Sequence, residues 1–209
     1  MVTTLAVVTL IGYLIGSVPF GYLAGRIAGI DIRKFGSGNI GATNVVRVLG
    51  SRYGYPVFVF DFFKGVAAVQ VSTLISGSLH FSQPNNELCG IVAGVSSVIG
   101  HSYPVWLSFK GGKGVATSGG VIFSLMPFAA LIVGVVWIVM FLMTRYVSVA
   151  SISAAVALPV AVAGIIYFRQ AGAAVLLYFS IFLAVFVVIR HRSNLSRLLN
   201  GTEPRFHRR

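Results

Sequence analysis

Long apolar stretches with almost no charge constrain this 209-residue chain more than any other feature of its sequence. They cover residues 3–24, 55–75, 90–107, 115–143, 147–167 and 171–189. A helix needs about 20 apolar residues to cross a bilayer with a hydrocarbon core about 30 Å thick, and every stretch has about that length or more. Only 10% of the residues are charged, against roughly 25% in soluble domains. We therefore expect an all-α, polytopic integral membrane protein in which residues 1–209 form a single transmembrane domain.

The longest stretch, residues 115–143, exceeds one ordinary span. As a continuous helix it would measure roughly 43 Å. It contains Gly119, Gly120 and Pro127, and the proline predicts a break near Met126, because proline disfavours a helical conformation in the residue before it. Two short helices in place of one raise the expected spans from about six to about seven. A re-entrant short segment, tolerated only where it is buried in protein or lines a wet cavity, stays open.

The distribution of basic residues selects the orientation, because Lys and Arg favour the cytoplasmic side of a membrane. Arg26, Arg33 and Lys34 follow the first stretch, so the N-terminus is expected outside. The C-terminal tail carries Arg190, Arg192, Arg197, Arg205, Arg208 and Arg209. Seven spans place this tail in the cytoplasm, whereas six would leave it outside.

Composition excludes several other classes of protein. The formal net charge is +12, but a nucleic-acid-binding domain would carry its basic residues on a polar surface, so no nucleic-acid partner is expected. Cys89 is the only cysteine, which excludes a disulfide scaffold. The acidic residues are Asp31, Asp61, Glu87 and Glu203. They show no spacing typical of metal ligands, so we expect neither a metal site nor a cofactor.

Residues 35–44 form the first of three unusual polar segments on the expected inner face. This segment combines glycines, which permit positive φ, with polar side chains: Gly36, Gly38, Gly41, Ser37, Asn39, Thr43 and Asn44. Arg47 follows Thr43 at helical spacing. Backbone amides of such a loop can form an anion-binding nest; an ordinary turn is the alternative.

The second segment, residues 109–118, places Gly111, Gly112 and Gly114 around Lys113 before the next helix. Helix N-termini attract anions, and Lys113 adds a full charge. Leu107 occupies the position where a Walker A loop needs glycine, so nucleotide hydrolysis is not indicated. The alternative is a basic turn that only orients the chain. His101, just before the segment, is interpreted as a packing residue or a catalytic one.

The third segment, residues 190–197, places His191 and Asn194 three residues apart, on one helical face. Nonspecific binding of lipid headgroups by its arginines is the alternative. Asp61 and Lys64 lie three residues apart inside the second span, which favours a structural ion pair. The hydroxyls of Ser148 and Ser151 either bond back to helix carbonyls or bind a ligand.

Together the three segments predict one cationic, donor-rich site at the inner membrane surface. It has no Cys nucleophile and no convincing Ser–His–Asp set. Such a site suits a substrate that is already activated, such as an acyl phosphate, because the protein then supplies only positioning and charge stabilisation.

Seven short motifs stand out along the chain: GSVPFGYL (16–23), GSGNIGATN (36–44), DFFKG (61–65), GH (100–101), FKGGKGVAT (109–117), RYVSVAS (145–151) and HRSN (191–194). In these motifs, over nearly its whole length, the chain resembles the bacterial membrane glycerol-3-phosphate acyltransferases that use acyl phosphate rather than acyl-CoA or acyl carrier protein. The resemblance implies acyl transfer from acyl phosphate to the 1-hydroxyl of sn-glycerol 3-phosphate. The products are lysophosphatidic acid and phosphate, in the first step of bacterial phospholipid synthesis. It also implies a multi-pass protein of the bacterial inner membrane, in contact with membrane lipid, with its active site on the cytoplasmic side.

The composition of the three segments and the resemblance together assign site residues. The expected catalytic residues are Ser37, Arg47, Lys113, His191 and Asn194. The expected substrate-binding residues are Gly38, Asn39, Thr43, Asn44, Gly111, Gly112, Gly114 and Ser151. A transporter for phosphate-containing anions is the competing interpretation, favoured by the broken helix and the cationic membrane face.

Overall fold

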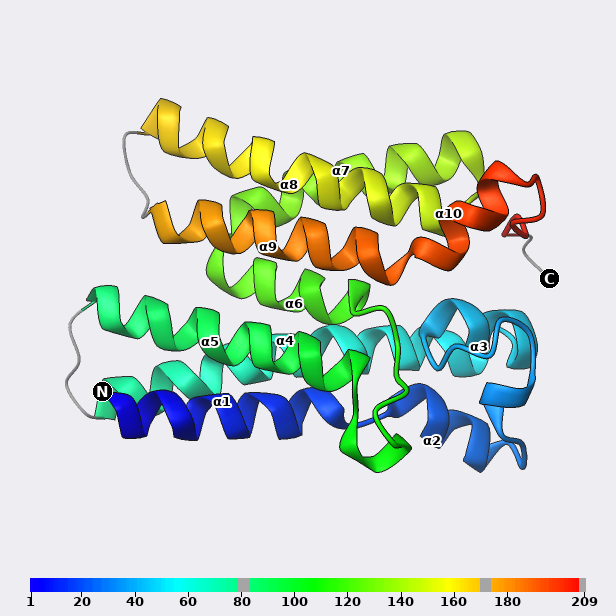
Figure 1. The fold of residues 1–209 in the computed structure, drawn as a ribbon, viewed down its shortest axis with the longest axis horizontal. Coiled ribbons are helices and arrows are strands. Elements are labelled where there is room, and N and C mark those ends of the chain that lie inside the picture. Colours follow the sequence, from blue (N-terminus) through cyan, green and yellow to red (C-terminus); the bar gives the residue numbers. More distant parts are fainter. Residues whose placement is uncertain (79–82, 170–173, 207–209) are drawn as a thin grey trace. The chain divides into compact units, whose positions relative to one another are not determined.

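The computed structural model describes residues 1–78, 83–169 and 174–206. All the secondary-structure elements within these ranges are helices, as the sequence predicts (Figure 1). The chain divides into two compact units, Met1–Leu125 and Met126–Arg209. Whether these units act as the single domain expected from the sequence stays a prediction.

The first unit contains α1 (Val2–Ser17), α2 (Phe20–Ile27), the 3-10 turn η1 (Ile32–Lys34), α3 (Ala42–Leu49), α4 (Ser51–Ser78), α5 (Gln83–Ser102), the 3-10 turn η2 (Val105–Leu107) and α6 (Val115–Leu125). Helix α1 packs along α5 and α4, and α4 packs on α5 and α6 (Figure 1). Short α3 lies against α4.

Helices α1 and α5 approach each other so closely that their backbones touch. A methyl group added at Gly12 would overlap the backbone of Ala93, and one at Gly16 would overlap the backbone of Ser97. Small residues permit this approach between membrane helices, where dispersion contacts rather than hydrophobic burial drive association. The contact fixes α5, and with it the polar segment that follows α5.

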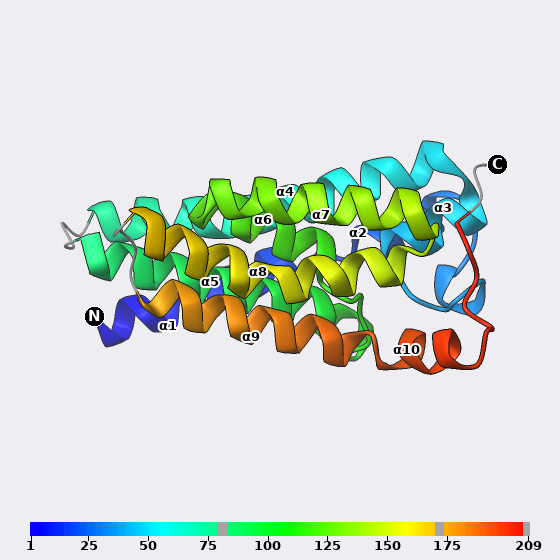
Figure 2. The same cartoon turned by 90° about the horizontal axis from the view of Figure 1, so that it is seen from above.

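The second unit contains α7 (Pro127–Thr144), α8 (Val147–Arg169), α9 (Ala174–Arg190) and α10 (Arg192–Leu199). Helix α8 packs between α7 and α9 (Figure 2). After α10 the chain turns back, and the Phe206 amide donates to the Arg145 carbonyl at 2.8 Å. The Phe206 ring also lies 5.6 Å from that of Phe141 in α7. The C-terminal segment is therefore tied to the α7–α8 junction.

The predicted break at Met126 is confirmed, since α6 ends at Leu125 and α7 begins at Pro127. The first stretch also breaks, between Ser17 and Phe20, which the sequence analysis did not predict. Pro19 accounts for it, because proline lacks an N–H and restricts the preceding Val18.

Five helical segments of the described residues are long and apolar enough to cross a membrane, or six if the bent pair α9–α10 is one span. The 11-residue α6 is apolar but shorter. The polytopic membrane fold is therefore confirmed, while seven crossings and the orientation of the termini stay predictions.

Candidate functional site

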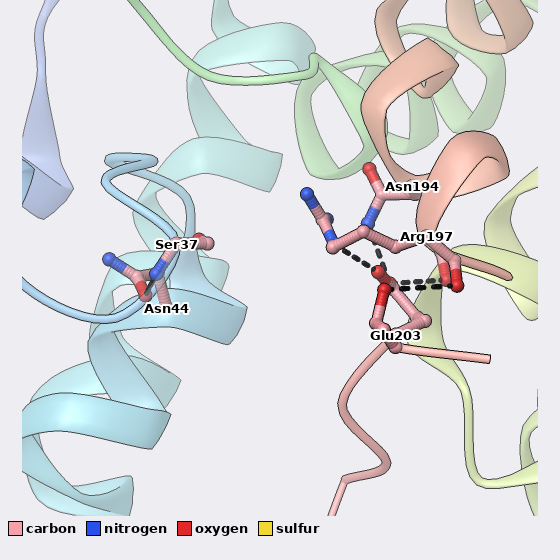
Figure 3. Close-up of polar contacts among 7 residues, drawn as sticks. Ser37, Asn44, Asn194, Arg197 and Glu203 are labelled. Atoms are coloured by element: carbon pink, nitrogen blue, oxygen red, sulfur yellow. Dashed lines mark hydrogen bonds and ion pairs between the residues drawn. The ribbon is translucent and has the colours of Figure 1, made fainter. Parts of the chain in front are cut away.

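Asn44 organises the first polar segment from inside. Its side chain is buried, and its Nδ2 donates to the carbonyls of Phe35 at 3.1 Å and Asn39 at 2.9 Å. Its Oδ1 accepts from the Ser37 amide at 2.8 Å (Figure 3). Asn44 therefore shapes the loop, a role that the sequence interpretation as a substrate-binding residue did not include.

The predicted positive φ angles occur at Gly36 (59°) and Gly38 (69°). Gly41 has φ −70° instead and is the N-cap residue of α3. The amides of Ser37, Gly38 and Gly41 all donate within the loop, to the Asn44 side chain, the Phe35 carbonyl and the Asn39 side chain. These three amides therefore do not form the anion nest expected from the sequence.

The segment also offers polar side chains. Ser37 is exposed at the loop, and Arg47 is partly exposed on α3, one helical turn beyond Thr43 as predicted. Nearby Asp31 forms an ion pair with Arg33, in which Arg33 Nη2 lies 2.7 Å from Asp31 Oδ2. The hydrogen bond from the Arg33 side chain lowers the pKa of Asp31 to about 2, so Asp31 is a poor base.

The glycine segment is laid against the end of α5. The Gly111 amide donates to the Ser102 carbonyl at 3.1 Å, and the Gly112 amide donates to the His101 carbonyl at 3.0 Å. Gly114 has φ +82°, a conformation that side chains disfavour, and α6 begins at the next residue. Lys113 is half-buried between these glycines, and its role as a phosphate ligand stays a prediction.

Two hydroxyls at the start of α6 are buried. Thr117 Oγ1 and Ser118 Oγ have no hydrogen-bond partner among the described residues. Buried polar groups are nearly always bonded to protein or water, so these hydroxyls are further candidates for contact with a bound ligand or an ordered water.

The two loops of the first unit share one hydrophobic cluster. Leu107, just before the glycine segment, packs with Ile40 of the first loop and Val45 of α3. All three side chains are at most 5% exposed. The fold therefore brings the first and second polar segments to the same end of this unit.

The predicted ion pair within α4 is confirmed. Lys64 Nζ lies 2.7 Å from Asp61 Oδ1, and both side chains are 3% exposed. Lys64 also donates to the Val18 carbonyl at 2.9 Å, at the break between α1 and α2.

In the second unit, the chain bends by 56° at His191, between α9 and α10. The buried His191 ring places Nδ1 2.8 Å from the Val187 carbonyl oxygen. A carbonyl only accepts, so Nδ1 carries the proton, and in the neutral ring Nε2 is the acceptor. Asn194 follows in α10, and its backbone amide donates to the backbone carbonyl of His191 at 2.9 Å. The two residues are thus neighbours, as their spacing predicts.

Glu203 joins three separate donors, a role that the sequence analysis missed. Its Oε1 accepts from Asn194 Nδ2 at 2.6 Å, and its Oε2 accepts from Arg197 Nε at 2.7 Å (Figure 3). Oε1 also accepts from Ser148 Oγ at 2.7 Å. Burial opposes the charge, but these hydrogen bonds outweigh it and hold the pKa of Glu203 below its ordinary value. Its sequence signal is that Glu203 is one of four acidic residues in a chain of net charge +12, which favours pairing with a neighbouring arginine.

Ser151 is engaged within the second unit. Its hydroxyl accepts from Trp137 Nε1 at 3.2 Å and donates to the Val147 carbonyl at 2.8 Å. The back-bonding alternative considered from the sequence is therefore observed at Ser151, whereas Ser148 bonds to Glu203.

The sequence places the chain among known proteins. The family model described as glycerol-3-phosphate acyltransferase matches residues 6–201. A glycerol-3-phosphate acyltransferase of Aquifex aeolicus is 43% identical over 93% of this chain and 95% of its own length. One of Mesorhizobium japonicum is 46% identical, with 92% of this chain and 91% of the relative covered.

Solved structures give the same result for the fold. A crystal structure of PlsY, an integral membrane glycerol 3-phosphate acyltransferase, in its glycerol 3-phosphate form has a TM-score of 0.83 and 39% identity, covering 97% of this chain and 96% of that one. The lysophosphatidic acid form has a TM-score of 0.81 and 38% identity, covering 97% and 95%.

Proposed function

Because the chain belongs to the glycerol-3-phosphate acyltransferase family, we propose that it transfers a fatty acyl group from acyl phosphate to the 1-hydroxyl of sn-glycerol 3-phosphate. The hydroxyl oxygen attacks the acyl carbonyl carbon, and the bond from that carbon to the phosphate oxygen breaks. Lysophosphatidic acid and phosphate are the products, and the hydroxyl proton ends on the departing phosphate, which leaves as hydrogen phosphate. This reaction would be the first step of bacterial phospholipid synthesis.

The ion pairs of three of the four acidic side chains support the choice of acyl phosphate as donor. Asp31 pairs with Arg33, Asp61 with Lys64, and Glu203 with Arg197. Each is engaged with a cation rather than poised as a base. A mixed anhydride with phosphate as leaving group needs less activation of the nucleophile than other acyl donors, so electrostatic stabilisation can carry more of the catalysis.

We assign roles from the chemistry of each side chain. Lys113 and the glycines beside it hold the phosphate of glycerol 3-phosphate, because a cation among close backbone amides suits a phosphate dianion. Ser37 and Arg47 stabilise the acyl phosphate. His191 and Asn194 orient the attacking hydroxyl, His191 through Nε2, because its Nδ1 bonds the Val187 carbonyl.

The test is acyl transfer by the purified protein in detergent with acyl phosphate and glycerol 3-phosphate as the only substrates. Release of phosphate and appearance of lysophosphatidic acid in equal amounts are expected, with no product from palmitoyl-CoA. Turnover with palmitoyl-CoA and none with acyl phosphate would overturn the choice of donor. The assay contains no sealed compartment, so transport of an anion cannot produce the result.

We also propose that the protein lies in the bacterial inner membrane with these residues on the cytoplasmic side. The C-terminal arginines support this orientation. A green fluorescent protein fused after Arg209 should fluoresce in cells, and an alkaline phosphatase fused there should be inactive. The opposite pair of results would reverse the orientation.

A further inference from the structure

Three ionisable side chains meet inside the first unit. Lys64 Nζ and His101 Nδ1 lie 2.7 Å and 3.5 Å from the same oxygen, Asp61 Oδ1. All three side chains are at most 5% exposed. Asp61 and Lys64 belong to α4, and His101 belongs to the last turn of α5.

The histidine ring is in contact with the glycine segment. A methyl group added at Gly112 would overlap Nε2 of His101 and would also crowd the ring carbons Cε1 and Cδ2. The backbone of His101 accepts from the Gly112 amide at 3.0 Å. One edge of the ring therefore faces the Asp61 carboxylate, and the other edge lies against Gly112.

Burying three ionisable side chains between membrane helices costs free energy. Buried ion pairs often stabilise a protein no better than well-packed apolar side chains of the same size, and ionisable groups inside membrane helices are rare unless they serve a function. Lys64 Nζ also ties the cluster to the break between α1 and α2 through the Val18 carbonyl, but this bond does not involve the His101 ring.

The glycine segment, in contrast, needs a support. Glycines have more backbone freedom than any other residue. When a ligand has to order a flexible loop, the entropy lost by the loop lowers the affinity for that ligand. The His101 ring provides a rigid surface for Gly112, and the Asp61–Lys64 pair fixes the orientation of that ring.

We propose that His101, oriented by the Asp61–Lys64 pair, is a positioning residue that holds the glycine segment in the shape that binds glycerol 3-phosphate. This inference rests on the proposed function, because it takes that segment as the glycerol 3-phosphate site. Its effect should fall on the KM for glycerol 3-phosphate and spare the KM for acyl phosphate.

The first test compares His101→Gln with His101→Asn. The glutamine amide reaches the position of Nε2 and can still contact Gly112, whereas the shorter asparagine amide reaches only the position of Nδ1. His101→Asn should raise the KM for glycerol 3-phosphate about tenfold, and His101→Gln should raise it by no more than about threefold. Equal effects, or a larger effect of His101→Gln, would show that contact with the loop is not what matters.

The second test uses steric coupling. Gly112→Ala clashes with the His101 ring, but an alanine at Gly111 would clash with the backbone oxygen of His101 and with Pro104. Gly112→Ala should raise the KM in the natural protein and have little further effect in His101→Asn, where the ring is gone. Gly111→Ala, the matched control, should be equally harmful in both backgrounds. Additivity at Gly112 would overturn the proposed contact.

The third test neutralises the ion pair without leaving a lone charge, in the double variant Asp61→Asn/Lys64→Met. We expect a raised KM for glycerol 3-phosphate and a circular dichroism melt that stays cooperative. An unchanged KM would restrict the pair to a structural role.

Hydrogen exchange of the amides of residues 111–114 provides a readout that does not depend on turnover. Exchange should be faster in His101→Asn and in the double variant than in the natural protein. Unchanged exchange contradicts the inference even if the enzyme is active. If exchange is faster in these variants but the natural protein itself does not transfer acyl groups, the proposed function is contradicted and the positioning role of His101 still holds.

Discussion

Replacement of Glu203 by glutamine tests whether the second unit depends on one carboxylate. The change keeps the size of the side chain and removes its charge. The carboxylate accepts three hydrogen bonds, from Ser148, Asn194 and Arg197. Glutamine has one acceptor oxygen and one NH2 group. If the oxygen keeps Ser148 and Asn194, the NH2 group faces Arg197 Nε, so donor meets donor.

The expected loss follows from this geometry. A hydrogen bond to a charged group contributes about 1.5–3 kcal/mol, and Arg197 is 35% exposed, so solvent reduces the loss to about 2 kcal/mol. For a chain of this size that corresponds to a fall in Tm of roughly 4–8 °C. Without the Arg197 bond the oxygen that accepts from Asn194 is held less firmly, and because Asn194 is expected to orient the attacking hydroxyl, kcat should fall as well.

The assay is a circular dichroism melt in detergent together with steady-state kinetics. Arg192→Gln, at an exposed position of α10, the helix that carries Arg197, is the control and should change the Tm by less than about 1 °C. Arg197→Gln should be destabilising alone but add little to Glu203→Gln, because both remove the same bond. If Glu203→Gln matches the natural protein in Tm and kcat, Glu203 does not organise this unit.

Other predictions concern pH, the glycine segment and the first loop. The folded pKa of Glu203 is lowered, so its stabilisation is complete above the ordinary carboxyl pKa and disappears as the pH falls through the folded value; the acid-side fall in Tm should be smaller in Glu203→Gln. Lys113→Ala should reduce kcat/KM by at least about a hundredfold with an unchanged melt, while the neighbouring Lys110→Ala should not; similar rates for both would remove Lys113 from the site. Asn44→Leu should lower the Tm by several degrees and reduce activity, because buried donors and acceptors of the loop lose their partners; proteolysis at the loop should accelerate, and a loop as resistant as before would contradict this. Thr117→Val, which removes a hydroxyl without a partner among the described residues, should raise the Tm slightly; a lowered Tm would indicate a hidden hydrogen bond.

Local chemistry explains which features were predictable. Pro127 acts on its immediate neighbour, so the break at Met126 could be inferred from the sequence, and the spacing of Asp61 and Lys64 predicted their ion pair. Pro19 carried the same information and was overlooked within an apolar stretch. These effects operate within one helical turn.

Other features depend on contacts between distant residues. Ser148 and Glu203 lie 55 positions apart, and nothing periodic in the sequence relates them. Asn44 was correctly associated with the first loop, but its inward orientation depends on the path of residues 35–39 around it. His101 could be placed near a helix end, whereas its contact with Gly112 requires the return of the chain through η2.

The backbone contact between α1 and α5 has a consequence for how mutational surveys of this protein are interpreted. Gly12 and Gly16 have no room for even one methyl group, so nearly every substitution there should eliminate activity in a genetic complementation screen. Lys113 should give the same outcome for an unrelated reason. A screen scored by cell growth alone would therefore group helix-packing glycines with substrate ligands. Measuring the amount of folded protein in the membrane for each variant separates them, because the glycine variants should be missing and the Lys113 variants present.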